Sequence, residues 1–343
     1  MTERILSPRA LNRALLARQL LIERSPLSIA EAVEQVGGLQ TQYAPSGYVG
    51  LWTRLRDFPR DALTAALEDR TVIQATLMRV TIHVVSRRKF WAYATGVRHA
   101  RRQWALRTPG AGGGEATMIA AAARLRDALA PGPRTVKELG ELGAGFVGNL
   151  GLWIDLVRVP PSGTWERRRA DRLATAEDWV GPCDVTEATG REHLVRAYLR
   201  AFGPAAWRDI ASWAGVSVTE ARQAGEGLTL VRYLDGDGRE LIDLPDAPLP
   251  DPGTPAPVRF LPHWDANLLV HARRTGLVPE PYRPRIFSSR NPFSVGVYLV
   301  DGMVAGAWSL RDGRIELDPF TELMGRDQRA VEREREALEA FHA

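Results

Sequence analysis

The sequence predicts a mainly α-helical fold with small β-hairpins, built from tandem winged helix-turn-helix modules and a C-terminal α+β module. Three observations predict this fold. The order helix, capped helix, turn, helix and paired strands occurs three times along the chain. Segments rich in Gly or Pro separate the modules, and the last part of the chain combines short strands with a charged helix. The expected modules span residues 1–110, 115–185, 190–245 and 258–343.

The third segment shows this order most clearly. A second helix, 204–214, ends at Gly215, and a capping box at 217–220 starts the next helix. The residues at 235–238 favour a hairpin turn between two strands. The preceding helix presents one apolar face, made of Leu194, Val195, Tyr198, Leu199 and Phe202.

The middle segment repeats the order with a helix at 120–129, a capping box at 135–138 and a turn at 143–145. A wing containing Trp165 is expected after residues 159–163. Between turn and wing, we expect a helix whose apolar stripe consists of Phe146, Leu150, Trp153, Ile154 and Val157.

The first segment is less regular. Ser7 is expected to cap a helix whose apolar stripe, Leu11, Leu15 and Ile22, is interrupted by Gln19. A capping box at 28–31 starts a helix that ends at the glycines 37–38, and residues 72–86 are expected to form one or two strands. The remaining expectations are links at 110–114 and 245–257, hairpin turns at 301–302 and 312–313, and a final helix at 327–341.

Composition excludes several classes of site. The chain has 343 residues, a net charge of +4 and one cysteine, Cys183, which excludes an intrachain disulfide, a CxxC zinc site and a cysteine-ligated iron–sulfur cluster. Histidines occur at no metal-binding spacing, so no metal or other cofactor is expected, although a carboxylate magnesium site stays open. No signal peptide or apolar run of about 18 residues is present. We therefore expect a soluble, cytoplasmic, nucleoid-associated protein.

Winged helix-turn-helix modules usually bind DNA, because an exposed helix fits the major groove. Some instead dock proteins. Arg167, Arg168 and Arg169, here called the wing arginines, lie in the expected wing of the middle module. They are placed to contact DNA phosphates, or they form a solvated run of charge. Double-stranded DNA is therefore the expected partner.

The most informative stretch is residues 37–43, Gly-Gly-Leu-Gln-Thr-Gln-Tyr. After the two glycines the chain is expected to leave the helix and become extended, which places Gln40 and Gln42 on one face. Two amides on one face can hold a water molecule by donating and accepting hydrogen bonds. The alternative is that both are ordinary surface amides.

This stretch resembles the glutamine–aliphatic–glutamine motif of the winged-helix DNA glycosylases, a family that includes azinomycin-resistance and bacterial crosslink-repair glycosylases. Residues 77–85, 260–269 and 295–310 extend the resemblance over nearly the whole chain. It implies that Gln40 and Gln42 are catalytic. Thr41 departs from the pattern, since an aliphatic residue is usual there.

The resemblance implies a monofunctional glycosylase that removes N7-alkylated purines, including bulky natural-product adducts or interstrand crosslinks, in repair or self-resistance. Such purines are cationic and leave readily, so a positioned water suffices where a strong base is absent. Lys89 and Lys137 are the only lysines, and neither lies in a motif that suggests a Schiff-base nucleophile. Water is therefore the expected nucleophile.

Two further groups of residues are candidates. Arg79, Thr81 and His83 alternate with apolar residues, which predicts a strand with one polar face. This face contacts phosphate or lines the site, or it is the solvated outer face of a half-buried strand. His263 and Asp265 follow Pro262 and are possible supports of the site. Asp265 either stabilises an oxocarbenium ion or fixes its loop by an Asx turn.

Two other functions remain to be distinguished. A non-enzymatic DNA-binding regulator would use the same modules, although such regulators usually dimerise on spaced half-sites. The chain has no coiled-coil heptads and carries its modules in tandem, so a monomer is expected. A protein-interaction scaffold would show no salt-dependent affinity for DNA.

Overall fold

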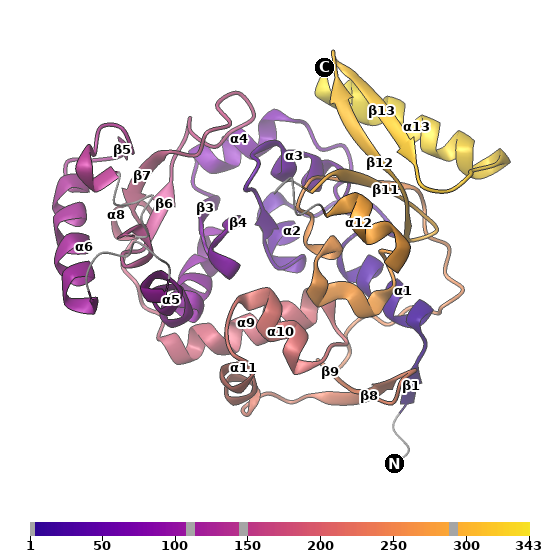
Figure 1. The fold of residues 1–343 in the computed structure, drawn as a ribbon, viewed down its shortest axis with the longest axis horizontal. Coiled ribbons are helices and arrows are strands. Elements are labelled where there is room, and N and C mark those ends of the chain that lie inside the picture. Colours follow the sequence, from indigo (N-terminus) through magenta and orange to yellow (C-terminus); the bar gives the residue numbers. More distant parts are fainter. Residues whose placement is uncertain (1–3, 108–113, 144–149, 288–293) are drawn as a thin grey trace.

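The computed structural model describes residues 4–107, 114–143, 150–287 and 294–343. Three small sheets are surrounded by helices, and the C-terminal sheet and helix lie together at one corner of the molecule (Figure 1). The helices are α1 (Pro8–Arg18), α2 (Ile29–Gln35), α3 (Pro45–Trp52), α4 (Asp61–Glu68), α5 (Phe90–Arg107), α6 (Glu115–Leu129), α8 (Ala176–Val180), α9 (Glu187–Phe202), α10 (Trp207–Ala214), α11 (Val218–Gly225), α12 (Arg283–Ile286) and α13 (Gly325–His342).

The largest sheet joins the first and middle segments. Its pairing places Gln74 of the first segment opposite Arg158 of the middle segment, so the sheet crosses the boundary expected near residue 110. All of its paired strands are antiparallel. In spatial order they are β2 (Leu39–Gln40), β4 (Ile82–Ser86), β3 (Val72–Thr76), β6 (Leu156–Arg158), β7 (Arg172–Thr175) and β5 (Arg134–Thr135).

The third segment has the predicted order of elements. Helices α9, α10 and α11 are followed by the hairpin of β8 (Val231–Asp235) and β9 (Glu240–Asp243). Gly215 ends α10 with a left-handed φ of 78°, and Ser217 and Glu220 form the predicted capping box. Strand β1 (Arg4–Leu6) pairs parallel with β8, so the first described residues complete the sheet of this segment.

The C-terminal sheet is a meander that contains both predicted hairpin turns. Strands β10 (Arg259–Leu261), β11 (Gly296–Val300), β12 (Met303–Arg311) and β13 (Arg314–Pro319) pair in chain order. Turns at 301–302 and 312–313 have positive φ at both positions, as Asp-Gly hairpin turns require. Helix α13 confirms the predicted charged helix and packs against β10, β11 and β13.

One predicted helix is wrong. Leu150–Leu152 form a 3₁₀ turn, and Val157 lies in β6, where an α-helix was expected. Strand β6 pairs with β3 on one side and β7 on the other, and all three of its residues are buried. A short apolar run is compatible with a buried strand as well as with a helix, which explains the wrong prediction. Phe146, residues 144–145 of the expected turn and residues 110–113 of the expected link lie outside the described part of the chain.

Helices α5 and α9 pack closely in the core because glycines face each other. A Cβ atom at Gly96 would lie 2.6 Å from the carbonyl oxygen of Gly190. Arginines also lie inside the fold: on α1, Arg18 is 1% exposed, pairs with Asp243 at 2.7 Å and donates to the carbonyl of Pro248. The segment expected to be a free linker, 245–257, is thereby anchored to α1.

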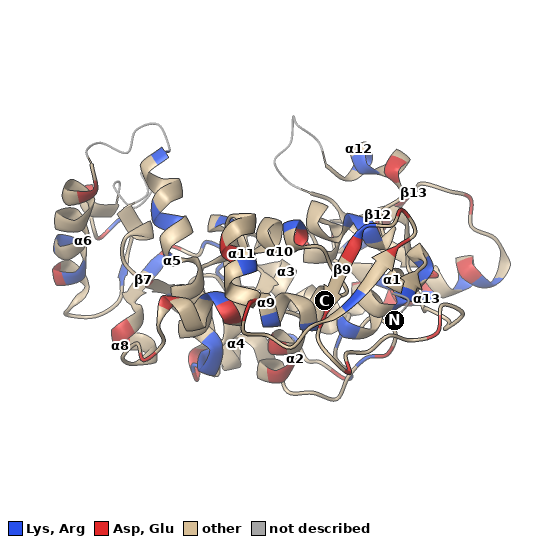
Figure 2. Cartoon of the chain, turned by 90° about the horizontal axis from the view of Figure 1, so that it is seen from below, with Lys and Arg blue, Asp and Glu red and all other residues tan. Residues whose placement is uncertain are grey.

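Charges of both signs alternate over most elements, consistent with the small net charge (Figure 2). No helix in the described part of the chain is both long and apolar enough to cross a membrane.

Candidate active site

The glutamine motif follows a sharp turn out of α2. Gly37 and Gly38 have φ values of 79° and 84°, which only glycine adopts readily. The chain then enters β2, where Gln40 lies opposite His83 of β4. This strand is only two residues long, and Gln42 falls in a bend before α3. The extended region is therefore shorter than predicted and ends before Gln42.

Both glutamine side chains nevertheless reach the same short segment, residues 79–82. The Oε1 atom of Gln40 accepts a hydrogen bond from Nη2 of Arg79 at 2.8 Å. The Oε1 atom of Gln42 accepts from the backbone N–H of Ile82 at 3.2 Å. Gln40 is 8% exposed, whereas Gln42 is open to solvent. One lone pair of each amide oxygen is thus taken. No described residue accepts from either Nε2 group, so each keeps two donors for a bound molecule.

The threonine between them has a buried partner. Thr41 is 2% exposed, and its Oγ1 accepts from Nε2 of Gln74 at 3.2 Å. Gln74 also donates to the carbonyl of Gly163 at 3.3 Å, at the base of the wing. Because the hydroxyl is hydrogen-bonded, a polar residue fits where the family pattern has an aliphatic one.

The segment around Arg79 differs from the alternating strand that was expected. Strand β4 starts at Ile82, and Arg79 and Val80 precede it in a turn with φ values of 54° and 58°. Thr81 donates from Oγ1 to the carbonyl of Met78 at 3.1 Å. The Arg79 side chain therefore reaches Gln40 from this turn. It does not project from the face of a strand.

The expectation that His83 lies on an open polar face is wrong. His83 is 2% exposed because β4 is covered on that side, and its Nδ1 bonds the carbonyl of Thr81 at 2.9 Å. Burial, together with the positive charge of Arg79, lowers the pKa of His83 to about 3, so the ring is neutral near pH 7. As placed, it supports the turn beneath Arg79 and is closed off from solvent.

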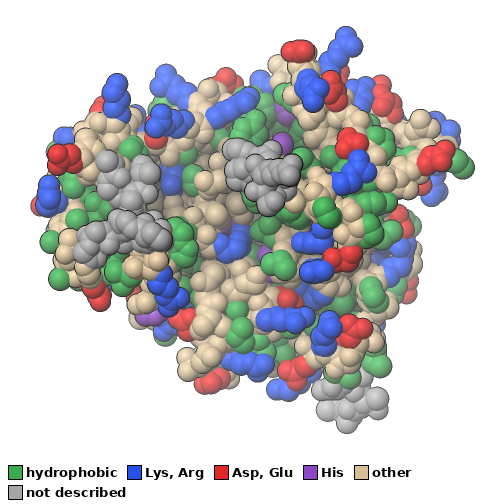
Figure 3. Space-filling view, in the orientation of Figure 1, with side chains coloured by type: hydrophobic (Ala, Val, Ile, Leu, Met, Phe, Trp, Pro, Cys, Tyr) green, Lys and Arg blue, Asp and Glu red, His purple; other side chains and the backbone are tan. Residues whose placement is uncertain are grey.

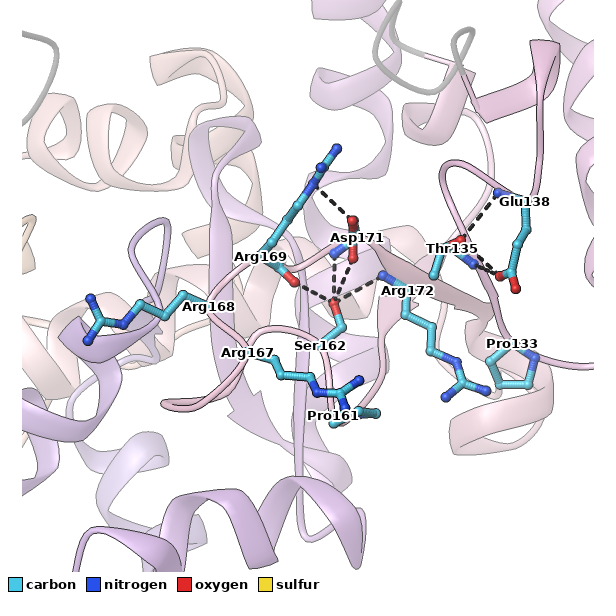
Figure 4. Close-up of a pocket in the computed structure, with 10 residues that line it drawn as sticks. All are labelled: Pro133, Thr135, Glu138, Pro161, Ser162, Arg167, Arg168, Arg169, Asp171 and Arg172. Atoms are coloured by element: carbon cyan, nitrogen blue, oxygen red, sulfur yellow. Dashed lines mark hydrogen bonds and ion pairs between the residues drawn. The ribbon is translucent and has the colours of Figure 1, made fainter.

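The wing arginines occupy the loop between β6 and β7, beside a cavity of about 510 Å³ (Figure 4). The Ser162 hydroxyl fixes this loop by accepting from the backbone N–H groups of Asp171 and Arg172 and donating to the carbonyl of Arg169. Arg169 pairs with Asp171 at 2.9 Å. The side chains of Arg167 and Arg168 extend in different directions from the loop.

Arg168 links the wing to the glutamine motif. Its Nη1 donates to the Tyr43 hydroxyl at 3.1 Å, and its guanidinium lies 5.7 Å from the centre of the Tyr43 ring. Tyr43 directly follows Gln42 in the chain. The Tyr43 ring also contacts the C-terminal module, since the His263 ring packs edge-on at 5.6 Å.

His263 and Asp265 have different surroundings. Nδ1 of His263 donates to the carbonyl of Ser294 at 2.6 Å, and burial lowers the pKa of the ring below its ordinary value. The His263 ring lines a pocket of about 270 Å³ together with Tyr43, Trp165, Trp308 and His342. Asp265 is buried, accepts from the backbone N–H of Asn267 in an Asx turn, and pairs with Arg54 at 2.8 Å.

The site thus lies where all four predicted segments meet. The first supplies Gln40 and Gln42, the middle segment supplies Arg168, and the C-terminal module supplies His263. The third segment contributes the carbonyl of Trp213, which accepts from Arg79. Figure 3 shows Lys and Arg side chains both around the rim and near the middle of the face of the molecule that it draws.

Several contacts of this site were not predicted. The bond from Arg79 to Gln40, the support of Thr41 by Gln74 and the pairing of Asp265 with Arg54 each join residues distant in the chain. The first segment gave one indirect signal, because Gln19 interrupts its expected apolar stripe. Helix α1 ends at Arg18, so Gln19 caps the helix and Ile22 lies beyond it. Gln19 is buried, and its Oε1 accepts from Arg54 at 3.3 Å.

Comparison with known proteins gives a consistent result. No curated protein matches the chain. Among solved structures, the Streptomyces sahachiroi DNA glycosylase AlkZ superposes with a TM-score of 0.82 over 98% of this chain and 97% of that protein, at 18% identity. At that identity the likeness establishes a shared fold. A family profile described as DNA glycosylase AlkZ-like matches residues 33–341. The chain therefore belongs to the AlkZ-like DNA glycosylase family and is a DNA glycosylase.

Proposed function

We propose that this DNA glycosylase hydrolyses the N-glycosidic bond of N7-alkylated purines in duplex DNA, with Gln40 and Gln42 holding the attacking water. The observation that carries the proposal is the arrangement of the two amides, which both end on residues 79–82 with their Nε2 groups unbonded to any described residue. A water between them can accept from one Nε2 and donate to the remaining lone pair of the other amide oxygen.

The substrate class follows from the chemistry that these side chains lack. An amide positions water but is a poor base, so the leaving group has to depart readily. Asp265 is the carboxylic acid among the predicted site residues, and it is engaged in an ion pair with Arg54. The His83 ring is neutral but closed in by burial. A purine alkylated at N7 meets the requirement, because its positive charge is relieved when the glycosidic bond breaks.

The duplex is held, in this proposal, by the three winged-helix segments acting as a monomer. The wing arginines lie on a loop held by the bonds of Ser162, and Arg168 contacts Tyr43 next to the motif. Their guanidinium groups are suited to backbone phosphates. The proposal extends to bulky adducts and interstrand crosslinks without assuming that the base is fully extruded, because a crosslinked base cannot simply leave the stack. A transcriptional regulator without activity is not supported, since the family is enzymatic.

The proposal is tested by incubating the protein with a duplex that contains one 7-methylguanine and analysing both products. Release of free 7-methylguanine with an intact abasic site is expected. A covalent protein–DNA adduct trapped by borohydride would instead indicate an amine nucleophile. A duplex carrying an N7-linked crosslink, tested in parallel, separates action on monoadducts from unhooking. Failure to release any alkylated base would refute the proposed substrate class.

A further inference from the structure

Arg79 bridges two segments at the glutamine motif. Its Nη2 donates to Oε1 of Gln40 at 2.8 Å, and its Nη1 donates to the carbonyl of Trp213 near the C-terminal end of α10. That end of a helix carries partial negative charge, which suits a guanidinium. Among the described residues, Arg79 has no carboxylate partner. Its side chain is largely buried, and the resulting loss of hydration lowers its pKa to about 10, which leaves it charged near pH 7.

The backbone of this turn is strained. The N–H of Thr81 bonds the carbonyl of Met78 at 3.1 Å, and both residues between them have positive φ. Such a type I′ turn normally contains Asn and Gly, whereas here it contains Arg79 and the β-branched Val80. Residues held in this region are energetically unfavourable and persist only where the surroundings fix them.

The surroundings do fix this turn. Leu77 and Met78 are buried in the core, at 1% and 0% exposure. On the opposite side the backbone of Arg79 rests against Gly215, where an added Cβ would lie 3.0 Å from the Arg79 nitrogen and 3.1 Å from its Cα. The fold therefore holds a conformation unfavourable for Arg79 itself, and the result is a guanidinium aimed at one amide.

We propose that Arg79 is a positioning residue for the glycosylase reaction, which fixes the Gln40 amide with its oxygen toward the guanidinium and its Nε2 toward the substrate. This inference rests on the proposed role of Gln40. Without the guanidinium, the amide can rotate by half a turn and exchange its donor and acceptor positions. A misplaced amide holds the attacking water poorly, so the loss falls on the reaction step and not on DNA binding.

The test uses Arg79→Gly, because glycine accepts the positive φ of this position without strain and leaves room for a guanidinium ion. We expect single-turnover excision of 7-methylguanine to fall at least about tenfold, with duplex affinity changed less than about threefold. Millimolar guanidinium chloride should restore much of the rate, and sodium chloride at the same ionic strength should not.

Four further variants serve as controls for the rescue. Gln40→Ala should not be rescued by guanidinium, because the amide that the ion would hold is absent. The double variant, Arg79→Gly with Gln40→Ala, should be no slower than Gln40→Ala alone, because both changes remove the same positioned amide. Arg79→Lys should remain impaired, because a single ammonium does not reproduce the planar fork that bonds two acceptors. Arg168→Ala, which removes a guanidinium from the wing, should weaken binding and lower its salt dependence.

A measurement without substrate separates this inference from the proposed function. In the DNA-free protein, the side-chain amide NMR signals of Gln40, identified by their absence in Gln40→Ala, should shift in Arg79→Gly and return with guanidinium. Unshifted signals would overturn the inference even if 7-methylguanine is excised. Excision at the wild-type rate by Arg79→Gly would also overturn it. So would a loss confined to affinity with a salt slope reduced by about one, which is the signature of a phosphate contact.

Discussion

Replacing Asp265 with Asn distinguishes a structural carboxylate from one that stabilises the oxocarbenium ion. Oδ2 of Asp265 pairs with Arg54 at 2.8 Å, and Oδ1 accepts from the backbone and side chain of Asn267 at 3.0 and 2.8 Å. In the Asn variant the remaining oxygen can keep both bonds to Asn267. The new amide nitrogen then faces Arg54, and the buried guanidinium loses its counter-ion.

The expected effect on stability is large because both partners are buried. The side chains of Arg54 and Asp265 are 1% and 2% exposed, so solvent screens the pair little. Removing one partner from a buried pair destabilises a protein by about 3–5 kcal/mol. With a typical unfolding entropy per residue, this lowers the melting temperature of a chain this long by about 4–7 °C.

The assay combines urea unfolding with excision measured at low temperature, where Asp265→Asn stays folded. We expect reduced stability with excision within about threefold of wild type. Arg54→Met serves as the partner variant, and the double variant should lose less than the sum of the two, because no unpaired charge remains buried. Unchanged stability with a large loss of excision would refute the structural role and make Asp265 part of the reaction.

Three further predictions follow from other parts of the structure. Replacing the wing arginines with Ala should weaken binding to all duplexes. It should also lower the slope of log affinity against log salt by about one for each phosphate that the variant no longer touches. An unchanged slope would mean that these arginines are only a solvated surface. The pKa values of His83 and His271 are lowered by burial, so the folded state keeps them neutral while the unfolded state gains protons below about pH 6.5. The contribution of these two rings to the free energy of unfolding should therefore be fully present above that pH. It should fall by about 1.4 kcal/mol per pH unit for each ring as the pH decreases to 5. Urea midpoints that do not change between pH 7 and 5 would contradict this. Thr41→Val should cost about 1 kcal/mol of unfolding free energy by removing the bond to Gln74, with excision almost unchanged, and a tenfold loss of excision would show that the hydroxyl takes part in the site.

Features with local causes were predictable from the sequence. The capping box that starts at Ser28, the left-handed glycine at 215 and the Asp-Gly turns of the C-terminal sheet all occur where expected, because each depends on neighbouring residues. The position of Gln40 beyond a pair of glycines was predictable for the same reason. The resemblance of residues 37–43 to the glutamine–aliphatic–glutamine pattern then singled out the motif.

Features set by distant contacts were not predictable. Residues 156–158, at the end of the apolar run, became a strand because β3 and β7 lie on either side of them, which no local pattern indicates. Arg79 and Val80 are unfavourable residues for a turn of positive φ, so the turn depends on packing against Gly215. The pairing of Arg54 with Asp265 spans 211 positions, and arginines in an arginine-rich sequence do not reveal which of them will be buried.

The proposed mechanism requires Gln40 and Gln42 to position the attacking water together. The direct test is single-turnover excision of 7-methylguanine by wild type, Gln40→Ala, Gln42→Ala and the double variant. Affinity is measured on the same duplex. We predict that each single variant loses at least about tenfold in rate, or roughly 1.4 kcal/mol of transition-state stabilisation, with little change in affinity. Because both amides hold one water, the double variant should be scarcely slower than the slower single variant. Wild-type rates in both single variants would contradict this mechanism.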